Sequence, residues 1–498
     1  MRVFLTAVVA WCLLVGPVCA DERLGRIAFP NSGSAAAQPP FIRGVLLLHS
    51  FEFDDAAEAF RQARQVDPGF AMAYWGEALT HNHPLWRYQD REAARKVLAL
   101  LGPTPDARRA KAPTAREQAY LATLDALYGE GDKAVRDRDY AAALARLSAA
   151  YPDDDEAKAF HALAILGTNV ERRDFAVDMR AAALVEDVFL RNQEHPGALH
   201  YMIHAYDNPM HAPLGLRAAS RYSRIAAHAA HALHMTSHIF FALGMWDDAV
   251  TANEASWAAS SARVERKGLG PAEHGYHAYL WLSYAYLQQG RVDDARRIVD
   301  HMSTMLEQAR TRGVAYHYAA GRAAWAVDSE RWTDLPKAPD AVSLAPPGGR
   351  AASLFADGLA ATRRGEMAAA EHALQALESV KQAASSTDAH HGMPMVSPAE
   401  AEGVAVTAVQ LAGVIALGRG EKDRGLALLQ QAAEAEDKMP FDYGPPLPPK
   451  PSRELLGEAL LEAGRPAEAA EAFRAALKRA PGRRLSLRGL AQAEGGSR

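Results

Sequence analysis

Residues 454–482 read ELLGEALLEAGRPAEAAEAFRAALKRAPG, and this stretch decides the fold. Gly457 lets two helices approach closely and Gly464 closes the turn between them, because glycine has no side chain to obstruct either. Phe473 is an aromatic side chain that can fill the wedge to the next unit. Pro481 ends the second helix, since proline cannot continue one. The stretch therefore predicts a helix–turn–helix unit.

The same unit recurs along the chain at irregular spacing. Long alternating runs of β-branched or aromatic residues, which would predict strands, are absent, and alanine is abundant. The best further copies are FIRGVLLLHSFEFDDAAEAFRQARQVDP (41–68), HMTSHIFFALGMWDDAVTANEASW (234–257), WLSYAYLQQGRVDDARRIVD (281–300), LFADGLAATRRGEMAAAEHALQAL (354–377) and LAGVIALGRGEKDRGLALLQQAAE (411–434).

This arrangement of small residues, an aromatic wedge and a terminal proline resembles the tetratricopeptide repeat family. The resemblance covers most of residues 41–490 and implies an all-α fold, an α-solenoid in which antiparallel helix pairs form a right-handed superhelix. In such a solenoid the first helix of each pair lines the concave groove. It also implies a protein or peptide partner, because these repeats mostly bind other proteins.

Two arrays are expected within the solenoid. An N-terminal array occupies residues 41–335 and carries a histidine-rich groove, and a C-terminal array occupies 350–490 and continues the first. A two-lobed arrangement split near residue 340 is the alternative. Three loop-like insertions are expected on the outside of the solenoid, and they span residues 335–350, 383–398 and 440–452.

The N-terminus predicts export. Arg2 precedes an apolar stretch over residues 3–18, and Val18-Cys19-Ala20 reads as a small-x-small cleavage site. We therefore expect a signal peptide over residues 1–20, a flexible lead-in over 21–40, and a periplasmic or secreted mature protein. Both cysteines of the chain lie in the signal, so the mature chain has no thiol for a disulfide or a metal.

Composition excludes two classes of partner. Charged residues make up 23% of the chain, with a formal net charge of −5 and no basic stripe, so no nucleic acid is expected. No later apolar stretch of spanning length is evident, so we expect no integral membrane segment after signal cleavage.

Histidines concentrate in residues 194–257, which hold eight of the chain's 19. Two HxxxH pairs stand out there, His200/His204 and His234/His238. Because residues four apart lie on one face of a helix, each pair points one way, and His231 extends the second pair into a histidine face.

Repeat alignment places the two pairs on neighbouring helices, which pack about 8–10 Å apart. Four imidazoles could then meet on one ion, and a thiol-free imidazole set suits zinc or copper. Asp207 follows His204 at the helix end, where it could be a ligand or orient one. Asp207 also begins an Asp-Asn-Pro turn signal, which accounts for it without a metal.

Two other interpretations of the histidines stay open. Imidazoles can simply pack in a helical core with one hydrogen bond each. Alternatively they form a neutral, aromatic groove that binds a peptide or small ligand, lined by His277, Trp281, Tyr284, His81, His83 and Trp86.

No catalytic motif accompanies the histidines. In HYMIH and HMTSH the residue after the first histidine is Tyr201 or Met235, so the glutamate base of the HExxH zinc proteases is missing. The leading hypothesis is an exported scaffold that binds a protein or peptide in its groove, and the absence of a catalytic motif favours binding over catalysis. The alternative is a metal-binding protein, or a metalloenzyme, centred on the two HxxxH pairs.

Overall fold

The computed structural model describes residues 22–170, 173–385, 389–390, 393–394, 397–441 and 444–495. The predicted signal peptide lies outside these residues. Export therefore stays a prediction.

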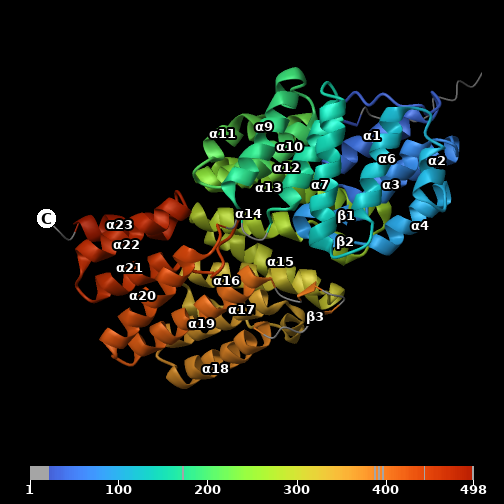
Figure 1. Ribbon diagram of the computed structural model, residues 1–498. Helices are drawn as coiled ribbons and strands as arrows, with labels where there is room; N and C mark the ends of the chain where they lie inside the picture. The colour runs from blue at the N-terminus through green and yellow to red at the C-terminus, as the bar shows by residue number, and fades with distance from the viewer. Residues whose placement is uncertain are drawn as a thin grey trace, which may run out of the picture.

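The N-terminal part of the chain runs from α1 to α16 and is drawn from blue to yellow in Figure 1. Its elements are α1 (Gln38–His49), α2 (Phe53–Val66), α3 (Ala71–Leu79), β1 (Asn82–His83), η1 (Pro84–Trp86), β2 (Tyr88–Gln89), α4 (Arg91–Leu101), α5 (Pro105–Arg109), α6 (Ala115–Leu127), α7 (Lys133–Ala150), α8 (Asp155–Gly167), α9 (Phe175–Arg191), α10 (Pro196–Tyr206), α11 (Ala212–Ile225), α12 (Ala230–Leu243), α13 (Trp246–Lys267), η2 (Pro271–Glu273), α14 (Tyr276–Gln288), α15 (Val292–Ala309) and α16 (Arg312–Ser329).

The C-terminal part continues with further helix pairs, drawn from orange to red in Figure 1. Its elements are η3 (Trp332–Asp334), η4 (Asp340–Leu344), α17 (Pro347–Arg363), α18 (Met367–Ala384), β3 (Ala389–His390), β4 (Met393–Pro394), α19 (Pro398–Gly418), α20 (Lys422–Lys438), α21 (Ser452–Glu462), α22 (Pro466–Arg479) and α23 (Arg484–Gly495).

The helix–turn–helix unit predicted over residues 454–482 forms most of α21 and all of α22. Gly464 closes their turn with φ +75°, in the left-handed region that glycine adopts without strain. A Cβ at Gly457 would lie 2.9 Å from the ring of Phe473, and a Cβ at Gly489 only 2.3 Å from it. Phe473 therefore fills the wedge between α21, α22 and α23, as the repeat pattern predicts.

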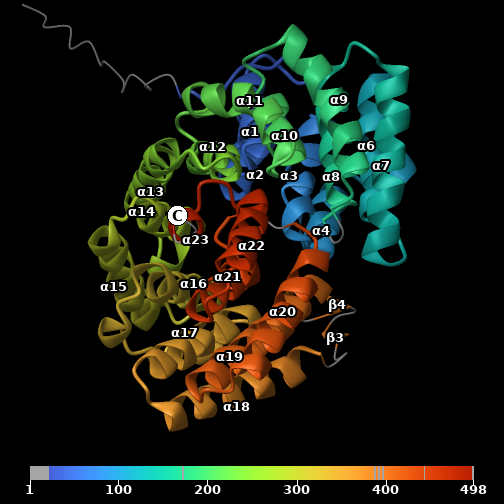
Figure 2. The ribbon, with the colours of Figure 1, turned by 90° about the vertical axis from the view of Figure 1, so that its left-hand side faces the viewer.

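The all-α solenoid is confirmed. Sequential helices pack against one another along the described chain, and the strands in it form only two short antiparallel ladders, β1 with β2 and β3 with β4. Figure 2 shows the helices following a curved path, with α21–α23 inside the curve.

The last helices return to the N-terminal part of the solenoid. Trp246 at the start of α13 donates its indole N–H to the carbonyl of Gly482, at 3.0 Å. Arg484 donates to the carbonyl of Leu287 at the end of α14, also at 3.0 Å. The C-terminal repeat thus lies against the inner wall rather than extending away from it.

A buried ionic network fixes this return. Arg483 is fully buried and donates to Glu454 at 2.7 Å and to the hydroxyl of Tyr284 at 2.7 Å. It also lies 3.1 Å from a carboxylate oxygen of Asp328. The buried guanidinium is thus paired with two carboxylates and a hydroxyl, and hydrogen bonds that involve charged groups are the strong ones.

Two segments differ from expectation. Residues 22–37, expected to be a flexible lead-in, instead bury Leu24 and Phe29. The ring of Phe29 contacts aromatic side chains of α1, α3 and α6, namely Phe41, Trp75 and Tyr120. The insertion at 440–452 is on the inside of the solenoid, not the outside: its described residues, including Phe441 and Leu447, line the central cleft.

The expectation that no later stretch has spanning length was also wrong. α19 is long and apolar enough to cross a membrane by length and composition alone. Within the fold, 61% of its most apolar window is buried. The apolar character of α19 is explained by its packing against α17, α18 and α20.

Candidate functional site

The two HxxxH pairs lie on neighbouring helices. His200 and His204 are one turn apart on α10, with 3.1 Å between their Nε2 atoms. His234 and His238 on α12 repeat this geometry, again with 3.1 Å between the Nε2 atoms. In both pairs the imidazoles therefore turn the same nitrogen toward each other.

Each pair has a third partner. His231, one turn before His234 on α12, joins His200 and His204, and these three residues form the first histidine cluster. His277 on α14 joins His234 and His238 to form the second histidine cluster. In each cluster, one ring nitrogen from every member lies within 4.8 Å of the others.

This arrangement differs from the predicted convergence of four imidazoles on one ion. The rings of His204 and His238 are 5.8 Å apart between centroids, whereas the rings within the pairs are 4.8 and 4.9 Å apart. The spacing between α10 and α12 keeps the two pairs apart. His231 joins the first pair and His277 joins the second, so that each pair becomes a cluster of three. The sequence placed His231 on the histidine face and His277 among the residues of a ligand-binding groove, but neither was predicted to bind a metal.

Hydrogen bonds fix the protonation of the second cluster. His238 Nδ1 lies 2.5 Å from a carboxylate oxygen of Asp207, so this nitrogen donates. His234 Nδ1 lies 2.7 Å from the side-chain oxygen of Asn253. Asn253 uses its amide N–H₂ to donate to the carbonyl of Ala249, so its oxygen is an acceptor and His234 Nδ1 also donates.

The facing Nε2 atoms of His234 and His238 consequently both carry lone pairs when the rings are neutral. Burial holds the pKa of His234 well below its usual range, which favours that neutral ring. Two lone pairs at 3.1 Å repel each other. Three imidazoles binding zinc tetrahedrally at about 2.0–2.1 Å have nitrogens roughly 3.4 Å apart, so the observed separation is close to that of a ligand set.

Hydrogen bonding and burial affect the first cluster in a similar way. His200 Nδ1 donates to the backbone carbonyl of His49 at 2.6 Å, which leaves its Nε2 unprotonated in the neutral ring. Burial lowers the pKa of His200 to about 3, and burial together with neighbouring histidines lowers that of His204 well below its usual range. His231 Nε2 is buried and has no hydrogen-bond partner among the described residues.

Phe51 packs against all three histidines of the first cluster. Its ring centroid lies 4.3, 6.0 and 5.4 Å from those of His200, His204 and His231. Phe51 has φ +56°, a left-handed conformation that is strained for a bulky residue. Such strain persists only where the surroundings impose it, and here it places an apolar ring against the imidazoles.

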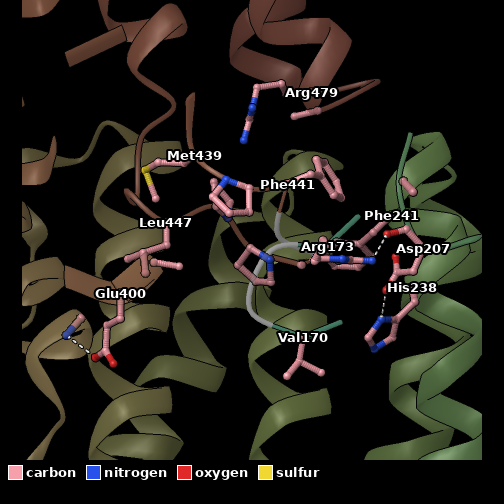
Figure 3. Close-up of a pocket in the computed structure, with 18 of the residues that line it drawn as sticks. Val170, Arg173, Asp207, His238, Phe241, Glu400, Met439, Phe441, Leu447 and Arg479 are labelled. Atoms are coloured by element: carbon pink, nitrogen blue, oxygen red, sulfur yellow. Dashed lines mark hydrogen bonds and ion pairs between the residues drawn. The ribbon is translucent and has the colours of Figure 1, made fainter. Parts of the chain in front are cut away.

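A cleft of about 530 Å³ opens beside both clusters. His204, Asp207 and His238 lie on one wall, one histidine from each cluster. Figure 3 shows His238 and Asp207 facing the cleft, with Phe441 and Leu447 from the C-terminal part among the residues across it. A volume of this size suits a small-molecule ligand.

Asp207 is not a member of the second cluster, and it contacts the cluster through His238. Its Oδ2 accepts the Nδ1–H of His238, and its Oδ1 is buried without a hydrogen-bond partner in the described part of the chain. A carboxylate that fixes the tautomer of a histidine is a common support of metal-binding imidazoles. Of the two predicted roles for Asp207, the geometry favours orientation.

The predicted peptide groove is largely filled by the chain itself. Trp281 and Tyr284 are buried, at 1% and 2% exposure. A Cβ at Gly444 would lie 2.5 Å from the ring of Trp281, and Arg483 donates to the hydroxyl of Tyr284. Trp281 instead packs over His238, with 4.3 Å between centroids. These two side chains are therefore not available to a peptide in this structure.

The other predicted groove residues lie at the β1–β2 hairpin. His83 stacks on Phe53 with 3.7 Å between ring centroids, and His81 precedes β1. Trp86 is 52% exposed and contacts His231 edge to face, at 5.6 Å between centroids. The hairpin thus borders the first cluster.

Sequence reasoning missed a third buried group behind the first cluster. Glu156 on α8 lies 2.7 Å from His49 Nε2 and 3.2 Å from His195 Nε2. His49 and His195 help to hold the pKa of Glu156 at about 2, against the opposing effect of burial. The three residues come from distant parts of the chain, and no local pattern in the sequence brings them together.

Comparisons with known proteins agree with the fold. The tetratricopeptide repeat family model matches residues 411–484 and 454–494. No curated protein sequence matches the chain.

Several solved structures resemble it at low identity. The match to the APC/C hetero-tetramer Cut9–Hcn1 has 13% identity and a TM-score of 0.37, and it covers 93% of this chain and 78% of that one. The match to yeast Tom70 has 11% identity and a TM-score of 0.35, and it covers 93% of this chain and 95% of that one. The match to the human IFIT1 dimer with m7Gppp-AAAA has 11% identity and a TM-score of 0.40, and it covers 93% of this chain and 92% of that one. Residues 411–494 thus match tetratricopeptide repeats, and they form part of the all-α solenoid described above.

Proposed function

We propose that this solenoid is a transition-metal-binding protein and that the second histidine cluster holds an ion. One observation carries the proposal: His234 and His238 both donate from Nδ1 to oxygen acceptors, so their Nε2 atoms, which face each other at 3.1 Å, are the nitrogens left to bind an ion. A cation between two imidazole nitrogens at this distance can bind to both of them.

The donor atoms narrow the class of metal. The cluster offers imidazole nitrogens alone, and the described chain contains no cysteine. Imidazole suits zinc and copper, with copper(II) bound more tightly than zinc at a comparable site. Calcium and magnesium prefer oxygen ligands and are disfavoured here.

Metal analysis of the full chain tests this proposal. After chelation, the protein is reloaded with zinc or copper, desalted and analysed for bound metal. We expect stoichiometric binding and an upward shift in melting temperature, because a ligand bound to the folded state stabilises it.

Two matched variants locate the ion. His277→Ala removes the most exposed member of the cluster, so it should fold while losing metal. His372→Ala removes an exposed histidine of α18 and should bind as the wild type does. Absence of bound metal in the wild type, or equal loss in both variants, would reject the proposal.

A second candidate function, binding of a protein or peptide, is supported by the hairpin. Trp86 and Tyr88 are 52% and 54% exposed on adjoining turns, and exposed aromatic side chains are typical anchors of interfaces. A photo-crosslinking residue at position 86 should capture one defined partner in cells. The same residue at the exposed Leu100 of α4 should not. Identical adducts from both positions would argue against a specific surface.

Export remains part of the proposal for this protein. It is supported by the apolar residues 3–18 followed by Val18-Cys19-Ala20. Mass spectrometry of the protein expressed from its full sequence should find a mature N-terminus at Asp21. A retained Met1 in the extracytoplasmic fraction would contradict cleavage.

A further inference from the structure

We infer that the first histidine cluster holds a second ion, so that six imidazoles form a dinuclear centre on the wall of the cleft. This inference rests on the proposed function and extends it. The two ions would be held by separate triplets of histidines rather than by the four imidazoles of the HxxxH pairs.

An orphaned nitrogen carries the argument for the first cluster. His231 Nε2 is buried without a hydrogen-bond partner in the described chain, although a buried polar atom normally has one. It belongs to a cluster in which His200 presents an unprotonated Nε2, fixed by the 2.6 Å bond from its Nδ1 to the carbonyl of His49. A metal ion there would give His231 Nε2 its missing partner and would bind His200 Nε2 next to His204 Nε2, which lies 3.1 Å from it.

The surroundings support a bound cation there. Glu52 lies at the edge of the cluster and accepts the backbone N–H of His231 at 3.0 Å. The strained Phe51 closes the apolar side of the cluster, since its ring contacts all three imidazoles.

The two clusters are direct neighbours. His204 and His238 have ring centroids 5.8 Å apart, and His231 and His234 have centroids 6.1 Å apart. His204 and His238 both line the cleft, so a small ligand in it would meet one histidine of each cluster. The cleft is therefore a shared approach to both ions.

Metal stoichiometry separates the inference from the proposed function. The chelated full chain is reloaded with copper(II) or zinc, and bound metal is counted per chain. We expect two ions in the wild type and one in His231→Ala. His277→Ala should also retain one, and the double variant none. His372→Ala on α18 serves as the control and should retain two.

The other outcomes are equally informative. One ion in the wild type, retained in His231→Ala and lost in His277→Ala, overturns the inference and leaves the proposed function standing. No bound ion overturns both. If His231→Ala fails to fold by circular dichroism, His204→Gln replaces it as the first-cluster variant and should likewise reduce binding to one ion.

Magnetic coupling tests whether the ions are adjacent. Two neighbouring copper(II) ions interact, so the electron paramagnetic resonance signal of the loaded wild type should fall below that of its copper content. His231→Ala, with one isolated ion, should give a full signal. Two coppers with an undiminished signal of isolated ions would place the second one outside the first cluster and overturn the inference.

Discussion

Polar groups are paired differently in two regions of the molecule. One is the ionic network around Arg483, and the other is the histidine wall, formed by the histidines of the two clusters on α10, α12 and α14. Around Arg483, each charged group has oppositely charged or hydrogen-bonding partners. Along the histidine wall, ring nitrogens of neighbouring imidazoles are directed at one another, with 3.1 Å between the Nε2 atoms of each HxxxH pair. The comparison separates polar groups that stabilise the fold from polar groups arranged for a ligand. Breaking the first should damage folding, and breaking the second should damage binding.

The largest effect is expected from Arg483→Met. Removing the guanidinium leaves Glu454 and Asp328 buried without their partner, and such a loss costs about 3–5 kcal/mol of the free energy of unfolding. Chemical denaturation of the metal-free protein measures it. As a control, Arg474→Met removes an exposed ion pair with Glu494 and should cost less than about 1 kcal/mol. Equal effects of the two changes would contradict the structural role of Arg483.

Asp207→Asn should weaken metal binding without unfolding the protein. The amide no longer holds His238 as a charged acceptor, and loss of such a support typically lowers affinity by about 10–100-fold. Competition titration against a chelator of known affinity measures the change. Unaltered affinity in a folded variant would show that the bond between Asp207 and His238 does not support a metal ligand.

Acid should weaken the C-terminal network through Glu454. Burial alone would raise the pKa of this carboxyl, but Arg483 and Lys450 lower it below its usual range. Its stabilising contribution is therefore complete above the unfolded value near pH 4.3 and is lost as the pH falls, by about 1.4 kcal/mol per unit. Denaturation curves of the metal-free protein between pH 5 and 3 test this, and Glu454→Gln should flatten the dependence.

The smallest effect on stability is expected from His204→Leu. The change removes one of the facing nitrogens from the first cluster and keeps a similar volume, so the metal-free free energy of unfolding should change by less than about 1.5 kcal/mol. The added stability that metal confers should nevertheless decrease. A loss of several kcal/mol without metal would mean that His204 is an ordinary packing residue.

Local patterns were sufficient to predict the repeat unit. Gly457, Gly464 and Phe473 lie at the spacing of a helix pair, and their contacts follow directly from that spacing. The i, i+4 geometry likewise predicted that His200 would face His204 and that His234 would face His238. These inferences depend only on neighbours in the sequence, where helical geometry is fixed.

Long-range contacts could not be predicted in the same way. Asp207 was a candidate because it ends the helix of His204. The other two acceptors that fix the imidazoles, the carbonyl of His49 and Asn253, are not selected by repeat geometry to within one residue. The return of Arg483 to Tyr284 joins residues far apart in the chain and covers the groove that the sequence left open. Curvature of the whole solenoid decides that contact, and no single repeat determines it.

Anomalous diffraction from crystals of the zinc-loaded protein tests the central claim most directly. We expect an anomalous-difference peak for zinc in the second cluster, about 2.0–2.1 Å from ring nitrogens of His234, His238 and His277. The further inference adds a peak in the first cluster. A loaded crystal with no peak at either cluster, and with His234 and His238 unchanged in conformation, would contradict the claim that these facing nitrogens are a metal site.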